Sequence, residues 1–64
     1  MTRLQQLREE HGWSRAELAR RSKLTPSIVG WTEDGRWKPY PVQLKKLGRA
    51  LKADPNILLQ EFRG

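Results

Sequence analysis

The chain has 64 residues, no cysteine, and 13 Lys and Arg against 7 Asp and Glu, which gives a formal net charge of +6. This length fits one small domain, residues 1–64, and the lack of cysteine excludes disulfides and thiolate metal sites. The single histidine, His11, cannot build a zinc site alone. The positive charge favours a nucleic acid or another anionic partner. Because no apolar run approaches the roughly 20 residues of a membrane span and no signal-peptide pattern occurs, we expect a cytoplasmic protein without a membrane partner.

Two short helices are expected near the beginning of the chain. The first covers residues 2–11, where Leu4 and Leu7 form an apolar stripe and Gly12 suits the left-handed position that ends a helix. The second begins with Ser-Arg-Ala-Glu at residues 14–17. This pattern is typical of a capping box, in which the Ser oxygen and the Glu side chain each accept a backbone N–H.

The next two helices also have clear start signals. The third is predicted to begin at Thr25 and Pro26, because Thr is a good N-cap and Pro suits the first helical position. It ends before Gly35. The fourth follows Pro41 and has an apolar stripe with i, i+3 and i+7 spacing. This stripe consists of Leu44, Leu47 and Leu51.

A fifth helix is predicted to start with Asp54 as its cap and Pro55 as its first residue. It carries more apolar side chains than one buried face needs, namely Ile57, Leu58, Leu59 and Phe62. No segment alternates with period two, and no turn has hairpin chemistry. The predicted fold is therefore all-α, with about five helices.

The second and third helices are separated only by residues 22–24, which predicts a helix-turn-helix. A longer pattern agrees in order and spacing: Leu18-Ala19, Leu24-Thr25, Val29, Glu33-x-Gly35, Lys38-Pro39, Leu44, Leu47, Ala50 and Leu51. In these residues the chain resembles the Cro/repressor (XRE-type, lambda-repressor-like) family over roughly residues 4–59. The resemblance implies a five-helix domain whose third helix enters the DNA major groove. It also implies dimers on two half-sites about one helical turn apart.

This resemblance selects nine candidate DNA contacts. They are Arg15, Thr25, Pro26, Ser27, Gly30, Trp31, Arg36, Trp37 and Lys38. Arg15 stands where the family commonly has Gln, and its forked donors suit a phosphate or a guanine. Thr25 and Ser27 can reach phosphates or base edges, whereas Pro26 makes only apolar contacts, such as one with a thymine methyl group. The structural alternatives are a solvated charge at Arg15 and simple capping at Thr25.

Gly30 and Trp31 depart from the family pattern, because their positions usually hold polar side chains that contact bases. Gly30 weakens a helix by roughly 0.8–1 kcal/mol relative to Ala, which suggests a close approach to a groove wall or a partner. Trp31 can pack on sugars and thymine methyl groups, or it can pack on the edge of the third helix. A Trp here also suits a protein partner.

Basic residues follow the third helix. Arg36 and Lys38 lie in the loop that, in the family, runs along the phosphate backbone, where such contacts position the protein. Trp37 either stacks on a sugar or packs beneath the loop, and the sequence does not decide between them. Lys45 and Lys46, near the start of the fourth helix, are candidates for a further phosphate contact.

Four other positions have structural interpretations. Arg8 and Glu33 match a pair that the family often uses as a buried ion pair, which is tolerated where a lone buried charge is not. Asp34 should repel nearby phosphates unless it caps the helix or pairs with Arg36. Lys23 stands where the family usually places Gly, and a left-handed conformation there would cost roughly 1–2 kcal/mol. The turn is therefore expected to differ slightly.

The sequence favours a sequence-specific double-stranded DNA-binding regulator, a repressor of phage, plasmid or mobile-element type. It is expected to bind an inverted repeat as a homodimer through the fifth helix, with Ile57 and Phe62 at the interface, and a separate protein antagonist would suit its small size. The alternative is a protein-interaction module, antitoxin-like or adaptor, using Pro26, Gly30 and Trp31. Non-specific binding of nucleic acid is a third reading. The residues offer no plausible catalytic set, so neither enzyme activity nor a cofactor or metal is expected.

Overall fold

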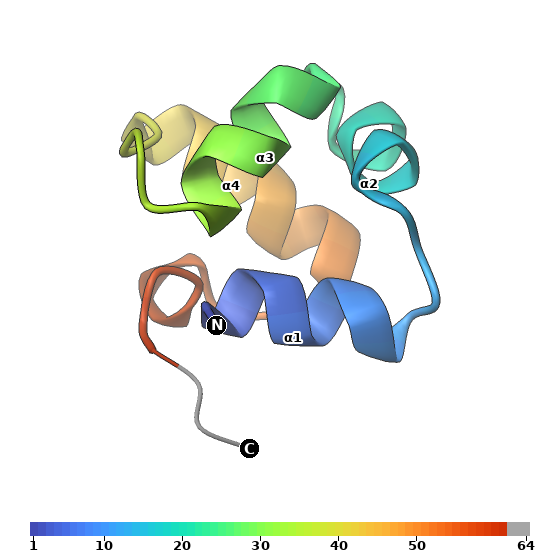
Figure 1. The fold of residues 1–64 in the computed structure, drawn as a ribbon, viewed down its shortest axis with the longest axis horizontal. Helices are drawn as coiled ribbons and strands as arrows, with labels where there is room; N and C mark the ends of the chain where they lie inside the picture. The colour runs from blue at the N-terminus through green and yellow to red at the C-terminus, as the bar shows by residue number, and fades with distance from the viewer. Residues whose placement is uncertain (62–64) are drawn as a thin grey trace.

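The structure is a computed structural model that describes residues 1–61. The described part contains four α-helices, one 3-10 helix and an isolated antiparallel bridge between Thr2 and Glu61. The elements are α1 (Arg3–Glu10), α2 (Arg15–Ser22), α3 (Pro26–Glu33), α4 (Pro41–Leu51) and η1 (Pro55–Ile57). In Figure 1, α1 lies along the bottom, α2 and α3 lie at the top, and α4 passes behind them. No helix within residues 1–61 is long and apolar enough to cross a membrane.

The predicted helix starts are confirmed by their capping hydrogen bonds. Ser14 Oγ accepts the backbone N–H of Glu17 at 3.0 Å, and Thr25 Oγ1 accepts that of Ile28 at 3.4 Å. The reciprocal half of the predicted capping box is not formed, because the carboxylate of Glu17 contacts Arg20 and Arg21 instead. The hydrogen bond from Arg20, together with the charge of both arginines, holds the pKa of Glu17 below its ordinary value.

The turn between α2 and α3 is built on a left-handed lysine. Lys23 has φ 60° and ψ 39°, so it adopts the conformation that costs a non-glycine residue free energy. The N–H of Leu24 donates to the carbonyl of Ala19 at 2.8 Å, which closes the end of α2 as in a Schellman motif. The short turn holds α3 against α2 as the predicted helix-turn-helix.

The fifth helix was predicted incorrectly, because η1 is only a single 3-10 turn of three residues. Its predicted cap is present, since Asp54 Oδ1 accepts the N–H of Asn56 at 2.9 Å. The carbonyls that follow are bound elsewhere: Leu58 accepts the N–H of Leu4 at 2.9 Å, and Gln60 accepts that of Arg3 at 2.8 Å. The chain thus pairs with the first turn of α1 instead of continuing a helix. Phe62 lies outside the described residues.

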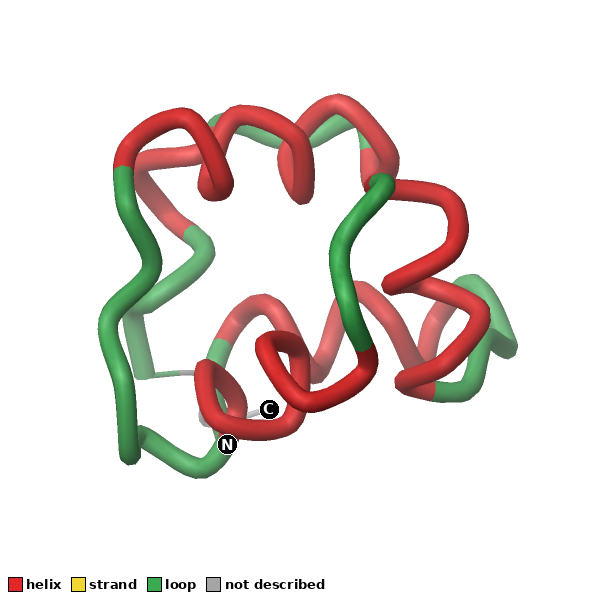
Figure 2. Tube along the Cα trace, turned by 90° about the horizontal axis from the view of Figure 1, so that it is seen from above, coloured by secondary structure: helices red, strands yellow, loops and turns green. Residues whose placement is uncertain are grey.

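The helices are arranged around a common centre when the molecule is seen from above (Figure 2). The core consists of seven buried hydrophobic residues from all four α-helices and the segment after η1: Leu4, Leu18, Ala19, Val29, Leu47, Leu51 and Leu58. Thr32 is also buried, and its hydroxyl donates to the carbonyl of Ile28 at 2.7 Å. The core fixes the inner faces of α2 and α3, so their other faces are available for a partner.

Candidate nucleic-acid interface

A buried ion pair joins α1 to the end of α3, as predicted. Arg8 Nε donates to Glu33 Oε2 at 2.7 Å, and Arg8 Nη2 donates to Glu33 Oε1 at 3.1 Å. The side chain of Glu33 is fully buried, and Arg8 also donates to the backbone carbonyl of Trp13 at 2.7 Å. This forked pair fixes the position of the C-terminal end of α3 relative to α1.

The same carboxylate also holds Arg15 at the start of α2. Arg15 Nε donates to Glu33 Oε1 at 3.1 Å, and Arg15 Nη2 donates to Asp34 Oδ1 at 3.2 Å. Asp34 is the C-cap of α3, which is one of the two expected roles, but its carboxylate pairs with Arg15 and not with Arg36. Desolvation by itself lowers the pKa of Arg15, but the charges and hydrogen bonds of the two carboxylates outweigh it and raise that pKa above its ordinary value.

Gly30 provides space for the Arg15 guanidinium. A Cβ atom added at Gly30 would lie only 3.2 Å from Arg15 Nη1, which is closer than ordinary van der Waals contact. Gly30 itself is buried. The close approach that the sequence suggested at this glycine is therefore made within the protein, by Arg15.

The structure brings six of the nine candidate contacts together around one shallow hollow of about 410 Å³. Its lining residues come from the start of α2, from α3 and from the loop after α3: Arg15, Pro26, Ser27, Gly30, Trp31, Asp34 and Arg36. Asp34 is the only acidic residue among them. The hollow thus combines two guanidinium groups, a hydroxyl and apolar surface, the residue types that contact DNA phosphates and base edges.

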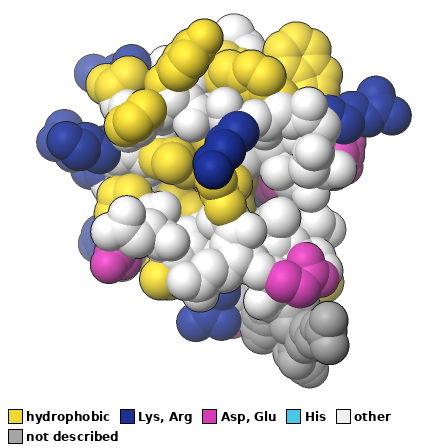
Figure 3. Space-filling model, turned by 90° about the vertical axis from the view of Figure 1, so that its left-hand side faces the viewer, with side chains coloured by type: hydrophobic (Ala, Val, Ile, Leu, Met, Phe, Trp, Pro, Cys, Tyr) yellow, Lys and Arg dark blue, Asp and Glu magenta, His cyan; other side chains and the backbone are white. Residues whose placement is uncertain are grey.

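Three aromatic rings form a cluster next to this hollow. The ring centroid of Trp37 lies 6.4 Å from that of Trp31 and 5.8 Å from that of Tyr40, both in edge-to-face geometry. Trp37 is half-buried between two exposed rings, since Trp31 is 47% exposed and Tyr40 is 65% exposed. Figure 3 shows hydrophobic side chains gathered on the upper part of the face that carries the loop between α3 and α4, with Lys and Arg around them.

Sequence reasoning did not select Tyr40, because a single Tyr between two prolines has no helical periodicity to mark it. The sequence also left the role of Trp37 open. The structure shows it as the middle ring of the cluster. The only signal available was the density of aromatic residues after α3.

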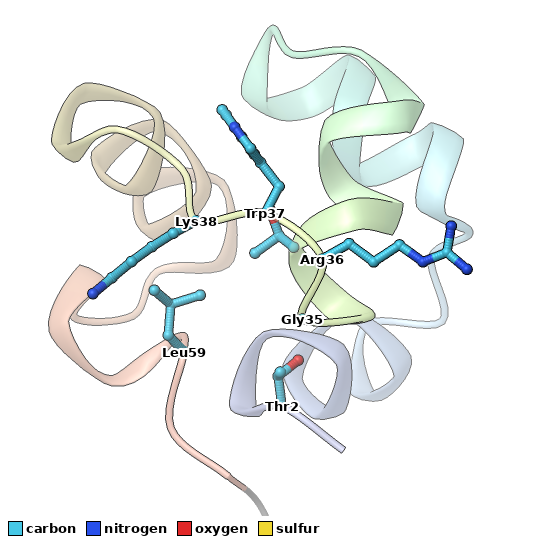
Figure 4. Close-up of a pocket in the computed structure, with 7 residues that line it drawn as sticks. Thr2, Gly35, Arg36, Trp37, Lys38 and Leu59 are labelled. Carbon is cyan, nitrogen blue, oxygen red and sulfur yellow. The ribbon is translucent and has the colours of Figure 1, made fainter.

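The loop after α3 separates its two basic residues (Figure 4). Arg36 and Lys38 extend in opposite directions from the loop, and Trp37 lies between α3 and α4. A second hollow of about 360 Å³ lies under this loop and is lined by both basic residues, together with Trp37, Thr2 and Leu59. Arg36 thus lines both hollows, whereas Lys38 lines only the second of these two, and Thr25 lines neither.

Lys46 lies in a different group of cations. A third hollow of about 340 Å³, between the end of α2 and α4, is lined by Arg21, Ser22, Lys23, Lys46, Arg49 and Ala50. It shares no residue with the first hollow. Lys45 is exposed on α4. Within residues 1–61, no group of three or more His, Asp or Glu side chains could hold a metal ion.

Comparisons with known proteins agree with this geometry. A family profile described as "Helix-turn-helix domain" matches residues 2–60. Similar solved structures include the restriction-modification controller protein C.AhdI from Aeromonas hydrophila, which is 39% identical with a TM-score of 0.81, over 88% of this chain and 85% of that one. They also include the hypothetical transcription factor NHTF from Neisseria, which is 32% identical with a TM-score of 0.80, over 88% of this chain and 63% of that one. A search of curated proteins finds no match. The chain therefore belongs to the XRE-like helix-turn-helix family of DNA-binding transcription regulators.

Proposed function

We propose that this protein binds a specific sequence in double-stranded DNA and acts as a repressor of phage, plasmid or mobile-element type. The observation that carries the proposal is the hollow that gathers Arg15, Ser27, Trp31 and Arg36 on one side of the helix-turn-helix. The major groove, about 12 Å wide, admits an α-helix such as α3. The likeness to a restriction-modification controller protein supports a regulatory role. We expect neither catalysis nor a cofactor.

The side chains divide into base readers and phosphate contacts. Ser27, exposed in the first turn of α3, and Arg15 face bases in the major groove, while Pro26 and Trp31 contact thymine methyl groups or sugars. Arg36 and Lys38 hold phosphates on the two sides of the loop, and the hydroxyl of Thr25 reaches a phosphate beside them. Lys45 and Lys46 add a phosphate contact from α4. Gly30 and Trp37 contribute indirectly to this surface. Gly30 leaves space for the Arg15 side chain, and Trp37 packs against Trp31.

A homodimer on an inverted repeat completes the proposal. The half-buried Ile57, in η1, together with Phe62, is the proposed contact between the two copies. Two recognition helices spaced one helical turn apart on one face of DNA require such a pair. Sedimentation that shows only monomers at high concentration, both free and on DNA, would rule the homodimer out.

Two alanine variants test the division of roles. Ser27→Ala should change the preferred base at one position, lowering discrimination there by roughly tenfold, because a base-edge contact is removed. Lys38→Ala should weaken binding to all duplexes alike and reduce the slope of log affinity against log salt by about 0.9. Affinities measured over a set of single-base site variants check both outcomes. Uniform weakening by Ser27→Ala would contradict base reading from this position.

The aromatic cluster favours a second candidate function, the docking of a protein partner. Trp31 and Tyr40 are exposed, Trp31 lines the same hollow as Pro26, and aromatic residues are enriched at protein interfaces. Gly30, which the sequence included in this face, is covered by Arg15. A salt titration separates the two functions, because affinity for DNA falls steeply with salt and an apolar protein contact does not.

A further inference from the structure

We propose that Asp34 is a specificity-determining residue. Its carboxylate disfavours binding of the Arg15 guanidinium to a phosphate and leaves the guanidinium able to bind an uncharged base edge. This inference rests on the proposed function, because it concerns how the same surface distinguishes a site from other DNA. Asp34 is the acidic member of the first hollow, where an acid would otherwise only weaken DNA binding.

The guanidinium of Arg15 is fixed on two sides. Two of its five N–H donors are used, one on Glu33 at 3.1 Å and one on Asp34 at 3.2 Å. Its Nη1 atom stands close above Gly30 and has no protein acceptor among residues 1–61. The side chain is still 42% exposed, so the remaining donors can reach an acceptor outside the protein. The protein thus presents a preoriented donor edge on the hollow that faces the proposed groove.

Arg15 lies between two carboxylates. It shares Glu33 with Arg8, which also lies 3.7 Å from Glu9, whereas Asp34 pairs with Arg15. A phosphate that approached Arg15 would also approach the carboxylate of Asp34, which is 46% exposed and bound to the same guanidinium. The negative phosphate and the negative carboxylate of Asp34 repel each other. A guanine has no net charge, and its O6 and N7 atoms accept two N–H donors of one Arg. Asp34 therefore weakens the binding of Arg15 to a phosphate more than its binding to a guanine.

A purely structural ion pair predicts a different behaviour. Exposed pairs contribute little to stability, and the loss of one would leave the ratio of specific to non-specific affinity unchanged. The ratio of specific to non-specific affinity therefore distinguishes a role in specificity from a purely structural role, because a change in folding stability does not alter this ratio.

The test compares Asp34→Asn with Glu10→Gln, which removes the same charge from an exposed position on α1, where Glu10 contacts Gln6. Affinities are measured for a duplex that carries the site selected by the wild-type protein and for a scrambled duplex, over a range of salt. At about 0.1 M salt, Asp34→Asn should bind the scrambled duplex roughly tenfold more tightly, with a slope about 0.9 steeper, as one added phosphate contact requires. Its ratio of specific to scrambled affinity should fall roughly tenfold, while Glu10→Gln should keep the wild-type ratio within about twofold.

The outcomes separate this inference from the proposed function. A wild-type protein that prefers no duplex contradicts the proposed function and this inference together. A wild-type preference that Asp34→Asn leaves unchanged, or changes no more than Glu10→Gln does, overturns the role of Asp34 alone. A second variant, Asp34→Ser, is measured together with Asp34→Asn. It also lacks the charge, and Ser suits a helix end. A folding defect in one of the two variants then does not decide the result.

Discussion

Arg15 carries its positive charge at the start of α2, where the helix dipole disfavours a cation. Two carboxylates offset this cost, because Glu33 and Asp34 accept hydrogen bonds from the guanidinium at 3.1 and 3.2 Å. The two acids lie 18 and 19 residues further along the chain. Such partners cannot be predicted from local patterns, because only the packing of α3 against α2 brings them to the guanidinium.

The buried carboxylate of Glu33 should contribute strongly to stability. Glu33→Gln removes the charge that the buried Arg8 requires, and breaking a buried pair in this way costs about 3–5 kcal/mol. Urea unfolding should therefore show a much lower midpoint with an unchanged slope. Glu10→Gln, on the exposed side of α1, serves as the control and should stay within about 0.5 kcal/mol. A loss below about 1 kcal/mol for Glu33→Gln would contradict the role assigned to this pair.

The starts of the helices could be predicted from local sequence, whereas the length of the last element could not. Ser14, Thr25 and Asp54 were identified as caps from local sequence, and each side chain accepts a backbone N–H. The length of the last element depends instead on the first turn of α1, whose N–H groups take the carbonyls of Leu58 and Gln60. That competition connects the two ends of the described chain, so no local pattern signals it.

The candidate site was predictable to a similar extent. The family resemblance and the spacing of the two helices selected Ser27, Trp31 and Arg36, which the structure places around one hollow. The opposite directions of the Arg36 and Lys38 side chains were not predictable, because they depend on the path of the loop at Trp37 (Figure 4).

The turn between α2 and α3 gives a prediction at this scale. Lys23→Gly should stabilise the protein by about 1 kcal/mol, because Gly adopts a positive φ without the steric cost that Lys incurs. Lys46→Gly, in the middle of α4, should have the opposite sign and destabilise by roughly 0.8–1 kcal/mol. Thermal or urea unfolding of the two variants checks both signs. Destabilisation by Lys23→Gly would mean that the side chain of Lys23 makes a compensating contact.

At the scale of the whole molecule, charge and shape have separate roles. The net charge of +6 attracts DNA of any sequence, and it does not select a site. Selection requires a surface with fixed donors and apolar groups, which the hollow beside α3 offers through Arg15, Ser27 and Trp31. The buried ion pair and the core hold these groups in place, so the same packing that stabilises the fold preorganises the proposed reading surface.

Selection of binding sites from random duplex DNA at moderate salt, followed by sequencing, tests whether this protein binds a specific DNA sequence. We expect enrichment of an inverted repeat, whose half-sites are about one helical turn apart, centre to centre. Such a result would identify the half-site that α3 reads and support a dimer. A folded protein that enriches no sequence would contradict specific DNA binding, and it would favour a protein partner that docks on Trp31 and Tyr40.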